Sequence, residues 1–247
     1  MPCPGAPGGS ATVSSVANRA VIFDYFGTLT TSTPAGVWEQ LTERSAAPLG
    51  IPPDQWRRVL RDSLPERATG KLGGLQETIR VLAARCGADP SPAALAAAVA
   101  ARRDGQWPLI AALRPDAEPT LRVLHAHAIP VGVLSECTVE LADAWPSLPI
   151  AGLVTARVLS CEEGRRKPDL ELYRTAARRV GAVPRDCLYV GDGGDRELPG
   201  AVAAGMTAYL LRDAGWHDGK ARERQQEWPG PVLSALAEVL PVLGLAK

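Results

Sequence analysis

The stretch Ala20-Val21-Ile22-Phe23-Asp24 decides the fold class of this 247-residue chain. It is short, apolar and partly β-branched, and it leads into a polar turn that contains Gly27. A short apolar run bounded by a turn is typical of a strand that is buried on both faces, as the strands of parallel sheets are. The sequence therefore predicts a buried strand that ends at Asp24.

Four more runs of the same kind predict further strands. They lie at residues 131–134, 152–155, 187–190 and 207–211, and helical patterns separate most of them. Strands that alternate with helices are typical of a parallel, doubly wound sheet. We therefore expect an α/β fold with about five strands. Residues 231–243 predict one more amphipathic helix, interrupted at Pro241.

The region between about residues 33 and 113 breaks this alternation, because its patterns are helical throughout. Helices are expected at 37–44, 53–63, 75–85 and 91–103, the last with Ser91 as its cap and a high alanine content. We expect a small all-helical cap domain over residues 33–113. The α/β core domain would then combine residues 19–32 and 114–247, preceded by a flexible tail over residues 1–18, which are rich in Gly, Pro, Ser and Ala.

Composition excludes several classes of function. The chain has 27 basic and 27 acidic residues, so a general attraction to nucleic acid or anionic membranes is not indicated. No run approaches the roughly 20 apolar residues that cross a bilayer. The five cysteines are scattered without C-x-x-C spacing, which indicates free thiols in a reducing compartment and a cytoplasmic protein. They are Cys3, Cys86, Cys137, Cys161 and Cys187.

Polar residues stand at the ends of three predicted strands. The first strand ends in Asp24, the second leads into Ser135-Glu136, and the fourth leads into Gly191-Asp192-Gly193-Gly194. Ligand sites of doubly wound sheets lie at the carboxyl ends of the strands, near the point where the strand order reverses. The pattern therefore predicts a site that contains these side chains.

Four elements, in this order along the chain, resemble the four motifs of the haloacid dehalogenase superfamily. Residues 23–29 (FDYFGTL) resemble the nucleophile loop, and residues 133–135 (VLS) resemble the motif that carries the phosphate-binding Ser or Thr. Residues 166–169 (RKPD) resemble the lysine motif, and 189–192 (YVGD) with 197–201 (ELPGA) resemble the acidic metal loop. The helical region lies where the class with a cap between the first and second motifs has its insertion.

The resemblance implies a hydrolase that forms an aspartyl-phosphate on Asp24 during phosphoryl transfer. It implies Mg²⁺ bound by the Asp24 carboxylate, the Phe26 backbone carbonyl and the Asp192 carboxylate, which are hard oxygen ligands. Lys167 would supply a fixed cation, and Glu197, with Asp195 as a competitor, would orient Lys167 or metal-bound water. The implied phosphate- and substrate-binding set is Gly27, Thr28, Ser135, Glu136 and Lys167.

One position departs from the family pattern. Phosphatases of the family usually carry a second Asp two residues after the nucleophile as general acid and base, and here that residue is Phe26. Losing such a group typically costs about 10²–10⁴-fold in rate. Three consequences stay open: a substrate with a good leaving group, replacement of the acid by Glu136 or a cap residue, or slow or absent turnover.

Two rival functions follow from this departure. An aromatic residue at this position also occurs in the dehalogenating branch of the family, which needs no metal. Against that branch, Asp192 would face Asp24 without a cation and repel it. A chain that keeps the fold but not the activity would be a binding protein. We expect a magnesium-dependent phosphatase of a small phosphorylated metabolite, acting as a monomer or homodimer. The other basic residues of the runs at 165–167 and 178–179 are expected to be solvated.

Overall fold

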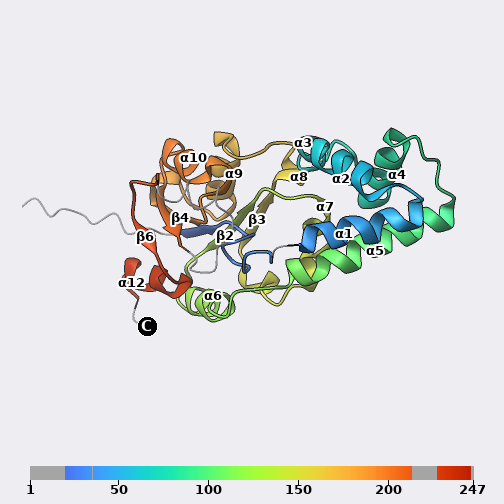
Figure 1. Cartoon of the computed structure of the whole chain (residues 1–247). Helices are drawn as coiled ribbons and strands as arrows, with labels where there is room; N and C mark the ends of the chain where they lie inside the picture. Colours follow the sequence, from blue (N-terminus) through green and yellow to red (C-terminus); the bar gives the residue numbers. More distant parts are fainter. Residues whose placement is uncertain (1–19, 35, 213–226, 246–247) are drawn as a thin grey trace, which may run out of the picture.

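The computed structural model describes residues 20–34, 36–212 and 227–245, and these residues form a doubly wound α/β fold (Figure 1). Their sheet has six strands, all parallel, in the order β3-β2-β1-β4-β5-β6. The predicted tail over residues 1–18 lies outside the described residues. The strands are β1 (Ala20–Phe23), β2 (Val131–Ser135), β3 (Ala156–Leu159), β4 (Cys187–Gly191), β5 (Thr207–Leu211) and β6 (Val232–Leu233).

Strand β1 is central because it pairs on both edges and is buried on both faces. Val21 is opposite Val131 of β2 on one edge and opposite Leu188 of β4 on the other. Side chains alternate along a strand, so Val21 and Phe23 pack into one core cluster, while Ala20 and Ile22 pack into a second cluster on the other face. This double burial explains why the run is apolar without alternation.

Helices cover the two faces of the sheet. Side chains of α6 and α7 pack into the cluster that contains Val21 and Phe23, and side chains of α9 and α10 pack into the other. The helices outside the insert are α6 (Ala117–Ala126), α7 (Val139–Ala144), α8 (Ser160–Glu163), α9 (Leu170–Arg179), α10 (Glu197–Ala203) and α12 (Val239–Val242). Short 3-10 helices connect them at Trp145–Ser147, Ala151–Leu153, Pro184–Asp186, Gly194–Arg196 and Leu236–Glu238.

Two sequence-based predictions are wrong. The strand expected at 152–155 lies four residues later, at Ala156–Leu159, because pairing with β2 sets its position: Ser135 is opposite Leu159, and the buried positions are Val158 and Leu159. The single helix expected over 231–243 is instead strand β6 followed by two short helices. The apolar pattern of these residues also suits a helix, but in the structure they pair with the open edge of β5. Arg212 N–H, just after β5, donates to Leu233 O over 2.8 Å.

Between β1 and α6, the described residues form helices and no strand of the sheet, apart from an isolated antiparallel bridge between Thr30 and Leu113. We call residues 36–110 the helical insert, and Figure 1 shows it extending to one side of the sheet. Its own core is built around Trp56, whose indole N–H donates to Ser45 Oγ over 3.0 Å. The insert comprises α1 (Val37–Ala46), a 3-10 helix (Ala47–Leu49), α2 (Pro53–Asp62), α3 (Leu64–Arg67), α4 (Leu75–Arg85) and α5 (Pro92–Ile110).

Helix α5 is longer than its pattern predicts, and the reason is its packing against α1. Ser91 caps the helix as expected, because its Oγ accepts the N–H of Ala94 over 3.2 Å. The helix then continues past Gly105, where a Cβ atom would lie 2.3 Å from the Leu41 side chain of α1. Among the described residues, no helix combines the length and apolar character needed to cross a membrane.

A buried ion pair joins the helical insert to the rest of the molecule. Arg102 of α5 donates from Nε to Glu140 Oε1 over 2.9 Å, and Gln106 of the same helix donates to that oxygen over 3.1 Å. The Arg102 and Glu140 side chains are 7% and 5% exposed, so water screens the pair little. The Arg102 charge lowers the pKa of Glu140 although burial raises it.

Replacing Arg102 with Leu is expected to lower the free energy of unfolding by about 3–5 kcal/mol, because Glu140 would keep a buried charge without its cation. Urea denaturation followed by circular dichroism measures the change. The double variant Arg102→Leu with Glu140→Leu should recover most of the loss, since it removes the stranded charge. A loss below about 1 kcal/mol in the single variant, the value typical of exposed pairs, would contradict the expected burial cost.

Candidate active site

Three neighbouring strands bring the predicted site residues to one edge of the sheet. Asp24 directly follows β1, Ser135 ends β2, and Asp192 directly follows β4. The strand order places β1 between β2 and β4, so the chain leaves β1 at the point where the order reverses. Asp24 is fixed to its neighbour strand, because its N–H donates to Val190 O over 2.9 Å.

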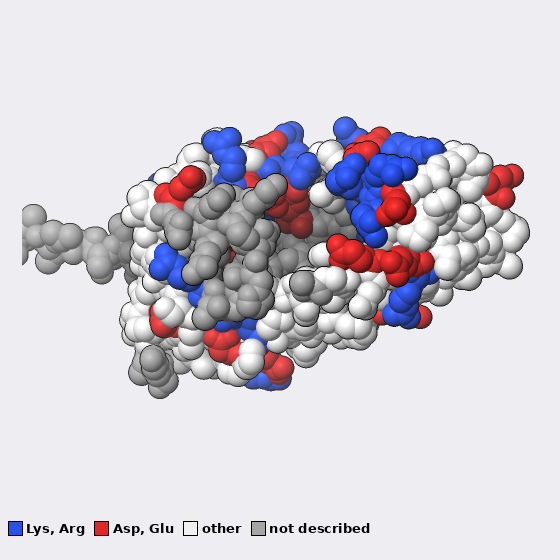
Figure 2. All heavy atoms as spheres, in the orientation of Figure 1, with Lys and Arg blue, Asp and Glu red and all other residues white. Residues whose placement is uncertain are grey.

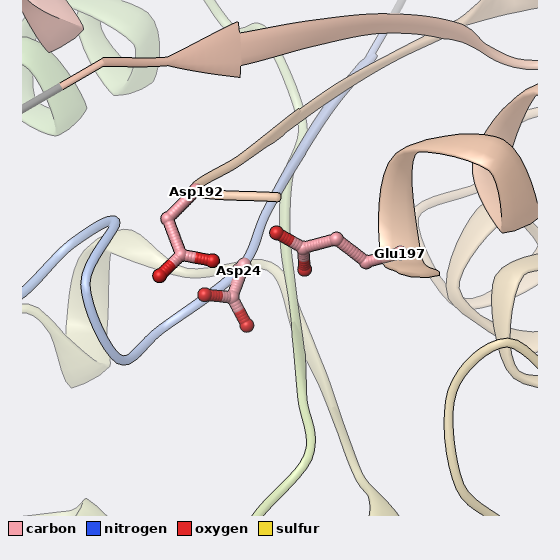
Figure 3. Close-up of side chains that lie close together, drawn as sticks. All are labelled: Asp24, Asp192 and Glu197. Carbon is pink, nitrogen blue, oxygen red and sulfur yellow. The ribbon is translucent and has the colours of Figure 1, made fainter. Parts of the chain in front are cut away.

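A cluster of three buried carboxylates lies at this edge. Asp24, Asp192 and Glu197 each offer an oxygen, and these oxygens lie within 4.8 Å of one another. Figure 3 shows the three side chains pointing toward a common centre from three segments of the chain. Their residues are 6%, 7% and 1% exposed. Buried like charges repel strongly, so the cluster needs a compensating cation.

Lys167, from the loop before α9, supplies part of that positive charge. Its Nζ donates to Asp24 Oδ1 over 2.5 Å and to Glu197 Oε2 over 2.6 Å. Burial lowers the pKa of Lys167, but the Asp24 and Glu197 charges outweigh it and hold the pKa well above its usual value. One ammonium against three carboxylates still leaves the cluster negative when all four groups are ionised.

The pKa values of the two aspartates are raised mainly by burial and further by the neighbouring carboxylates. Burial raises the pKa of Asp24 to about 7, although Lys167 lowers it, and the Glu197 charge raises it further. Burial also raises the pKa of Asp192 well above its usual value, with the charges of Glu197 and Asp24 acting in the same direction. A cation bound among the three carboxylates would favour their ionised forms and lower both values.

The backbone that leads to α10 explains how Glu197 reaches the cluster. Gly193, Asp195 and Arg196 all have positive φ values, of 91°, 48° and 56°, so the chain turns back on itself after Asp192. Gly193 N–H then donates to Glu197 Oε1 over 2.9 Å. Gly191 has to be glycine here, since a Cβ atom would lie 2.2 Å from the same oxygen.

Two tyrosines that sequence reasoning missed hold Glu197 in place. The Tyr189 hydroxyl donates to Glu197 Oε2 over 2.7 Å, and the Tyr173 hydroxyl donates to the Glu197 backbone carbonyl over 3.0 Å. Both rings belong to the core cluster below the site. No local sequence pattern at either tyrosine indicates a partner 8 or 24 residues away.

Ser135 is placed at the end of β2 with an unsatisfied hydroxyl. The residue is fully buried, and its Oγ has no hydrogen-bond partner among the described residues. Leaving a buried hydroxyl unpaired costs free energy, so this oxygen is available for a ligand. Thr28, from the loop after β1, instead donates its hydroxyl to Asp24 Oδ2 over 3.1 Å and helps to orient that carboxylate.

In the glycine-bearing turn, two of the backbone amides are hydrogen-bonded within the turn. Gly27 N–H donates to Thr30 Oγ1 over 3.2 Å, and Thr28 N–H donates to Tyr25 O over 3.3 Å. These two amides therefore satisfy the turn itself, because the loop closes on its own side chains. The backbone N–H of Tyr25 is hydrogen-bonded to the Asp24 carboxylate and lowers its pKa.

Glu136 forms an ion pair with Arg166, a residue that was expected to be solvated. Both Nε and Nη2 of Arg166 donate to Glu136 Oε1, the former over 2.8 Å. Arg166 is thus not a solvated charge, since its side chain is only one-third exposed. Glu136 Oε2 is buried without a hydrogen-bond partner in the described part of the chain. Burial raises the pKa of Glu136, and the nearby Asp195 charge raises it further.

Of the two acids considered for a supporting role, the structure brings Glu197 into contact with Lys167. Asp195 is exposed, and its left-handed backbone serves the turn that precedes α10. Phe26 lies in the loop after β1, two residues after Asp24, and its ring packs edge-to-face with Tyr25 at a centroid distance of 5.1 Å. A phenyl ring at this position cannot transfer a proton.

The oxygen ligands of the cluster suit a hard divalent cation. Asp24, Asp192 and Glu197 offer carboxylates only, with no soft or nitrogen ligand among the described groups that come this close. Mg²⁺ prefers carboxylate oxygens and water. The three residues are at most 7% exposed, so a bound cation would stabilise their ionised forms. The residues therefore fit the ion that the family resemblance implies.

The charges on the face shown in Figure 2 agree with the balanced composition. Figure 2 shows basic and acidic side chains interspersed on the visible face, without a field of one sign. Many of these charges are paired on the surface, for example Arg85 with Glu66 over 2.5 Å.

Comparison with known proteins identifies the family. The sequence profile of haloacid dehalogenase-like hydrolases matches residues 18–205. The chain is 31% identical over 206 residues to glyceraldehyde 3-phosphate phosphatase of Methanopyrus kandleri, a match that covers 83% of this chain and 88% of the relative. It is also 29% identical over 134 residues to phosphoglycolate phosphatase of Escherichia coli, covering 54% of this chain and 52% of that protein.

Solved structures show the same fold. The 2-haloacid dehalogenase from Pseudomonas syringae superimposes with a TM-score of 0.64 at 22% identity, covering 92% of this chain and 98% of that chain. A HAD phosphatase from Thermococcus onnurineus superimposes with a TM-score of 0.59 at 18% identity, with coverage of 92% and 98%. The order of the motifs, the meeting of Asp24, Lys167 and Asp192, and the profile match agree: the chain belongs to the haloacid dehalogenase-like hydrolases.

Proposed function

We propose that this protein is a magnesium-dependent phosphatase of a small phosphorylated metabolite, with Asp24 as its nucleophile. One observation carries the proposal. The Asp24 carboxylate lies 2.5 Å from Lys167 Nζ and shares a centre with the oxygens of Asp192 and Glu197. A carboxylate can attack an anionic phosphoryl group only where positive charge offsets their repulsion. Lys167 and a cation at the carboxylate cluster provide that charge.

The residues divide the work as follows. Asp24, Asp192 and the Phe26 carbonyl would hold Mg²⁺, which as a Lewis acid would offset negative charge on the phosphoryl oxygens. Asp24 attacks phosphorus, the bond to the leaving oxygen breaks, and an aspartyl-phosphate forms. Water then attacks that phosphorus, the bond between phosphorus and the Asp24 oxygen breaks, and inorganic phosphate leaves. Glu197, fixed by Tyr189 and the Gly193 amide, keeps Lys167 aimed at Asp24.

The phosphate would bind between Lys167 and Ser135. Lys167 is already oriented by two carboxylates, and the Ser135 hydroxyl has no hydrogen-bond partner among the described residues. Both groups come to the carboxyl edge of the sheet, so a phosphoryl oxygen in contact with each would be close to Asp24. Glu136 would complete the proposed substrate-binding set, whereas Thr28 would act through Asp24, and Gly27 would act through the turn that it closes with Thr30.

Phe26 limits the leaving group. Without an acid two residues after the nucleophile, an alkoxide would leave unprotonated, which is slow. A phenolate or carboxylate leaves readily without a proton. We therefore propose that the enzyme hydrolyses aryl and acyl phosphates well and simple alkyl phosphates poorly, unless another acid reaches the leaving oxygen.

The relatives suggest which metabolites to test first. The relative that matches over most of both chains is named as a phosphatase of glyceraldehyde 3-phosphate. The relative that matches over about half of both chains is named as a phosphatase of phosphoglycolate. We propose that the helical insert acts as a cap over the site and selects among such small phosphate esters. We place the reaction in the cytoplasm, because Cys86, Cys137, Cys161 and Cys187 are free thiols.

The direct test is an assay of the purified protein with Mg²⁺ against p-nitrophenyl phosphate, glyceraldehyde 3-phosphate and phosphoglycolate. Hydrolysis of the aryl ester with release of inorganic phosphate supports the proposal. Chloride release from a 2-haloacid without metal would establish the dehalogenase alternative, which the aromatic side chain of Phe26 favours. Phosphate binding with no turnover of any ester would indicate a binding protein.

Magnesium binding can be tested apart from activity. At a Mg²⁺ concentration about 100 times its Kd, we expect the melting temperature to rise by about 5–10 °C, because binding favours the folded state. Differential scanning fluorimetry measures the shift. Asp192→Asn should abolish it, whereas Asp186→Asn, which removes an acid just before β4 at the far end of the strand, should preserve it. An equal shift in both variants would exclude Asp192 as a ligand.

A further inference from the structure

Two buried cysteines lie side by side just behind the candidate active site. Cys137 follows β2 in the connection to α7, and Cys161 is the second residue of α8. Their Sγ atoms are 3.8 Å apart, within hydrogen-bonding range for two sulfurs. The two residues are 6% and 9% exposed. Cys86 and Cys187, the other cysteines in the described part of the chain, have no such thiol contact.

We infer that Cys137 and Cys161 form a reversible oxidation site that controls the geometry of the active site. Sulfur atoms in a disulfide are about 2.05 Å apart, so the pair needs a shift of less than 2 Å to close. Two hydrogen bonds already fix the segments to each other. Cys137 N–H donates to Ser160 Oγ over 2.9 Å, and that hydroxyl donates to Cys137 O over 3.1 Å.

The chemistry requires a small oxidant such as hydrogen peroxide, because Cys161 is only 9% exposed. The Cys161 thiolate attacks peroxide, the O–O bond breaks, and a sulfenic acid and hydroxide form. Cys137 then attacks this sulfur, the S–O bond breaks, and the second oxygen leaves as water. Each sulfur loses one electron and peroxide gains both. A dithiol reverses the change.

The assignment of Cys161 as the attacking thiol agrees with the contact between the two side chains. The hydrogen bond with Cys137 lowers the pKa of Cys161 and raises the pKa of Cys137. A thiolate, not a thiol, is the nucleophile in such reactions. Cys161 is also the more exposed of the two residues.

The position of the pair connects its oxidation to the site and to the helical insert. Cys137 lies two residues after Ser135, and Glu140, three residues further on, accepts the buried hydrogen bonds from Arg102 and Gln106 of the insert. On the other side, a Cβ atom on Gly70 of the insert would lie 2.1 Å from the Cys161 carbonyl oxygen. Closing the disulfide would therefore move two segments. One is the loop that follows Ser135, and the other is the segment at Cys161 that contacts Gly70 of the helical insert.

A shift of this size is expected to reduce the proposed activity by about tenfold or more, because a displacement of about 1 Å in a reacting geometry can cost 10²-fold. This consequence rests on the proposed function, whereas the disulfide itself does not. The reduced protein is treated with hydrogen peroxide, remaining thiols are alkylated, and peptides are mapped by mass spectrometry without reduction. We expect a peptide that links Cys137 to Cys161 and a loss of p-nitrophenyl phosphate hydrolysis. Adding dithiothreitol should remove the linked peptide and restore the hydrolysis.

Two cysteine variants distinguish oxidation of the Cys137–Cys161 pair from oxidation of the other thiols. Cys86→Ser, which removes a more exposed cysteine of the insert, should oxidise and recover like the native chain. Cys137→Ala should retain activity in peroxide. Absence of the Cys137–Cys161 peptide once Cys86 has been consumed would overturn the inference, as would equal inactivation of native and Cys137→Ala proteins. If the reduced protein hydrolyses no ester, the proposed function fails, but mass mapping still decides whether the pair oxidises.

Discussion

Asp24→Asn is expected to abolish phosphatase activity, with a loss of about 10⁴-fold or more in kcat. An amide oxygen is a poor nucleophile, so no aspartyl-phosphate can form. The fold should survive, because Asn has nearly the same shape as Asp and the substitution removes one of three crowded carboxylates, a group whose pKa burial has already raised to about 7. Initial rates with p-nitrophenyl phosphate, together with circular dichroism, measure the two effects.

Asp186→Asn is the matched control for this prediction. It makes the same chemical change just before β4, whereas the active site lies beyond the other end of that strand. We expect its rate to stay within about twofold of the native rate, because a substitution away from the core and the site usually has little effect. Native turnover in Asp24→Asn would refute the nucleophile assignment, and an equal loss in both variants would point to damage to the fold instead.

Phe26→Asp is expected to raise the turnover of alkyl phosphates by about 10²-fold, the lower end of what a positioned general acid contributes. The new carboxyl would protonate the leaving alkoxide and later deprotonate the attacking water. Turnover of p-nitrophenyl phosphate should change much less, because its leaving group needs no proton. The measurement compares kcat for glyceraldehyde 3-phosphate and p-nitrophenyl phosphate in the native and variant proteins.

The control is Phe26→Asn, because an Asn side chain is close to an Asp side chain in size and polarity. Unlike Asp, it cannot donate a proton to the leaving group. Both variants lose the ring that packs against Tyr25, so any shared change reports lost packing. A gain confined to Asp supports proton transfer. If neither variant gains on the alkyl ester, another group, such as Glu136, already supplies the acid, and Phe26 does not limit the leaving group.

Much of the site was predictable because the fold places the carboxyl ends of parallel strands together. Asp24, Ser135 and Asp192 each stand at the end of an apolar run, and the structure brings Asp24 and Asp192 into one cluster with Glu197. Their strand positions depend on burial on both faces, which the apolar runs encode directly. The strand at 156–159 and the segment after residue 230 were misplaced, because there the pairing partner decides the register.

Other features depend on contacts between residues far apart in the sequence. The Tyr189 and Tyr173 hydroxyls on Glu197, the Arg166 pair with Glu136, and the approach of Cys137 to Cys161 leave no local pattern. The turn at Gly27 likewise uses its amides within its own loop.

The sequence by itself determined the layered α/β fold, the helical insert and the position of Asp24 at the end of a buried strand, because burial and helix or strand periodicity are local properties of a chain. Only the tertiary structure decided which charges face each other across the site, how Glu197 and Lys167 are held, and which two thiols meet. Those outcomes follow from distances between separate segments, and such distances are set when the sheet assembles around β1.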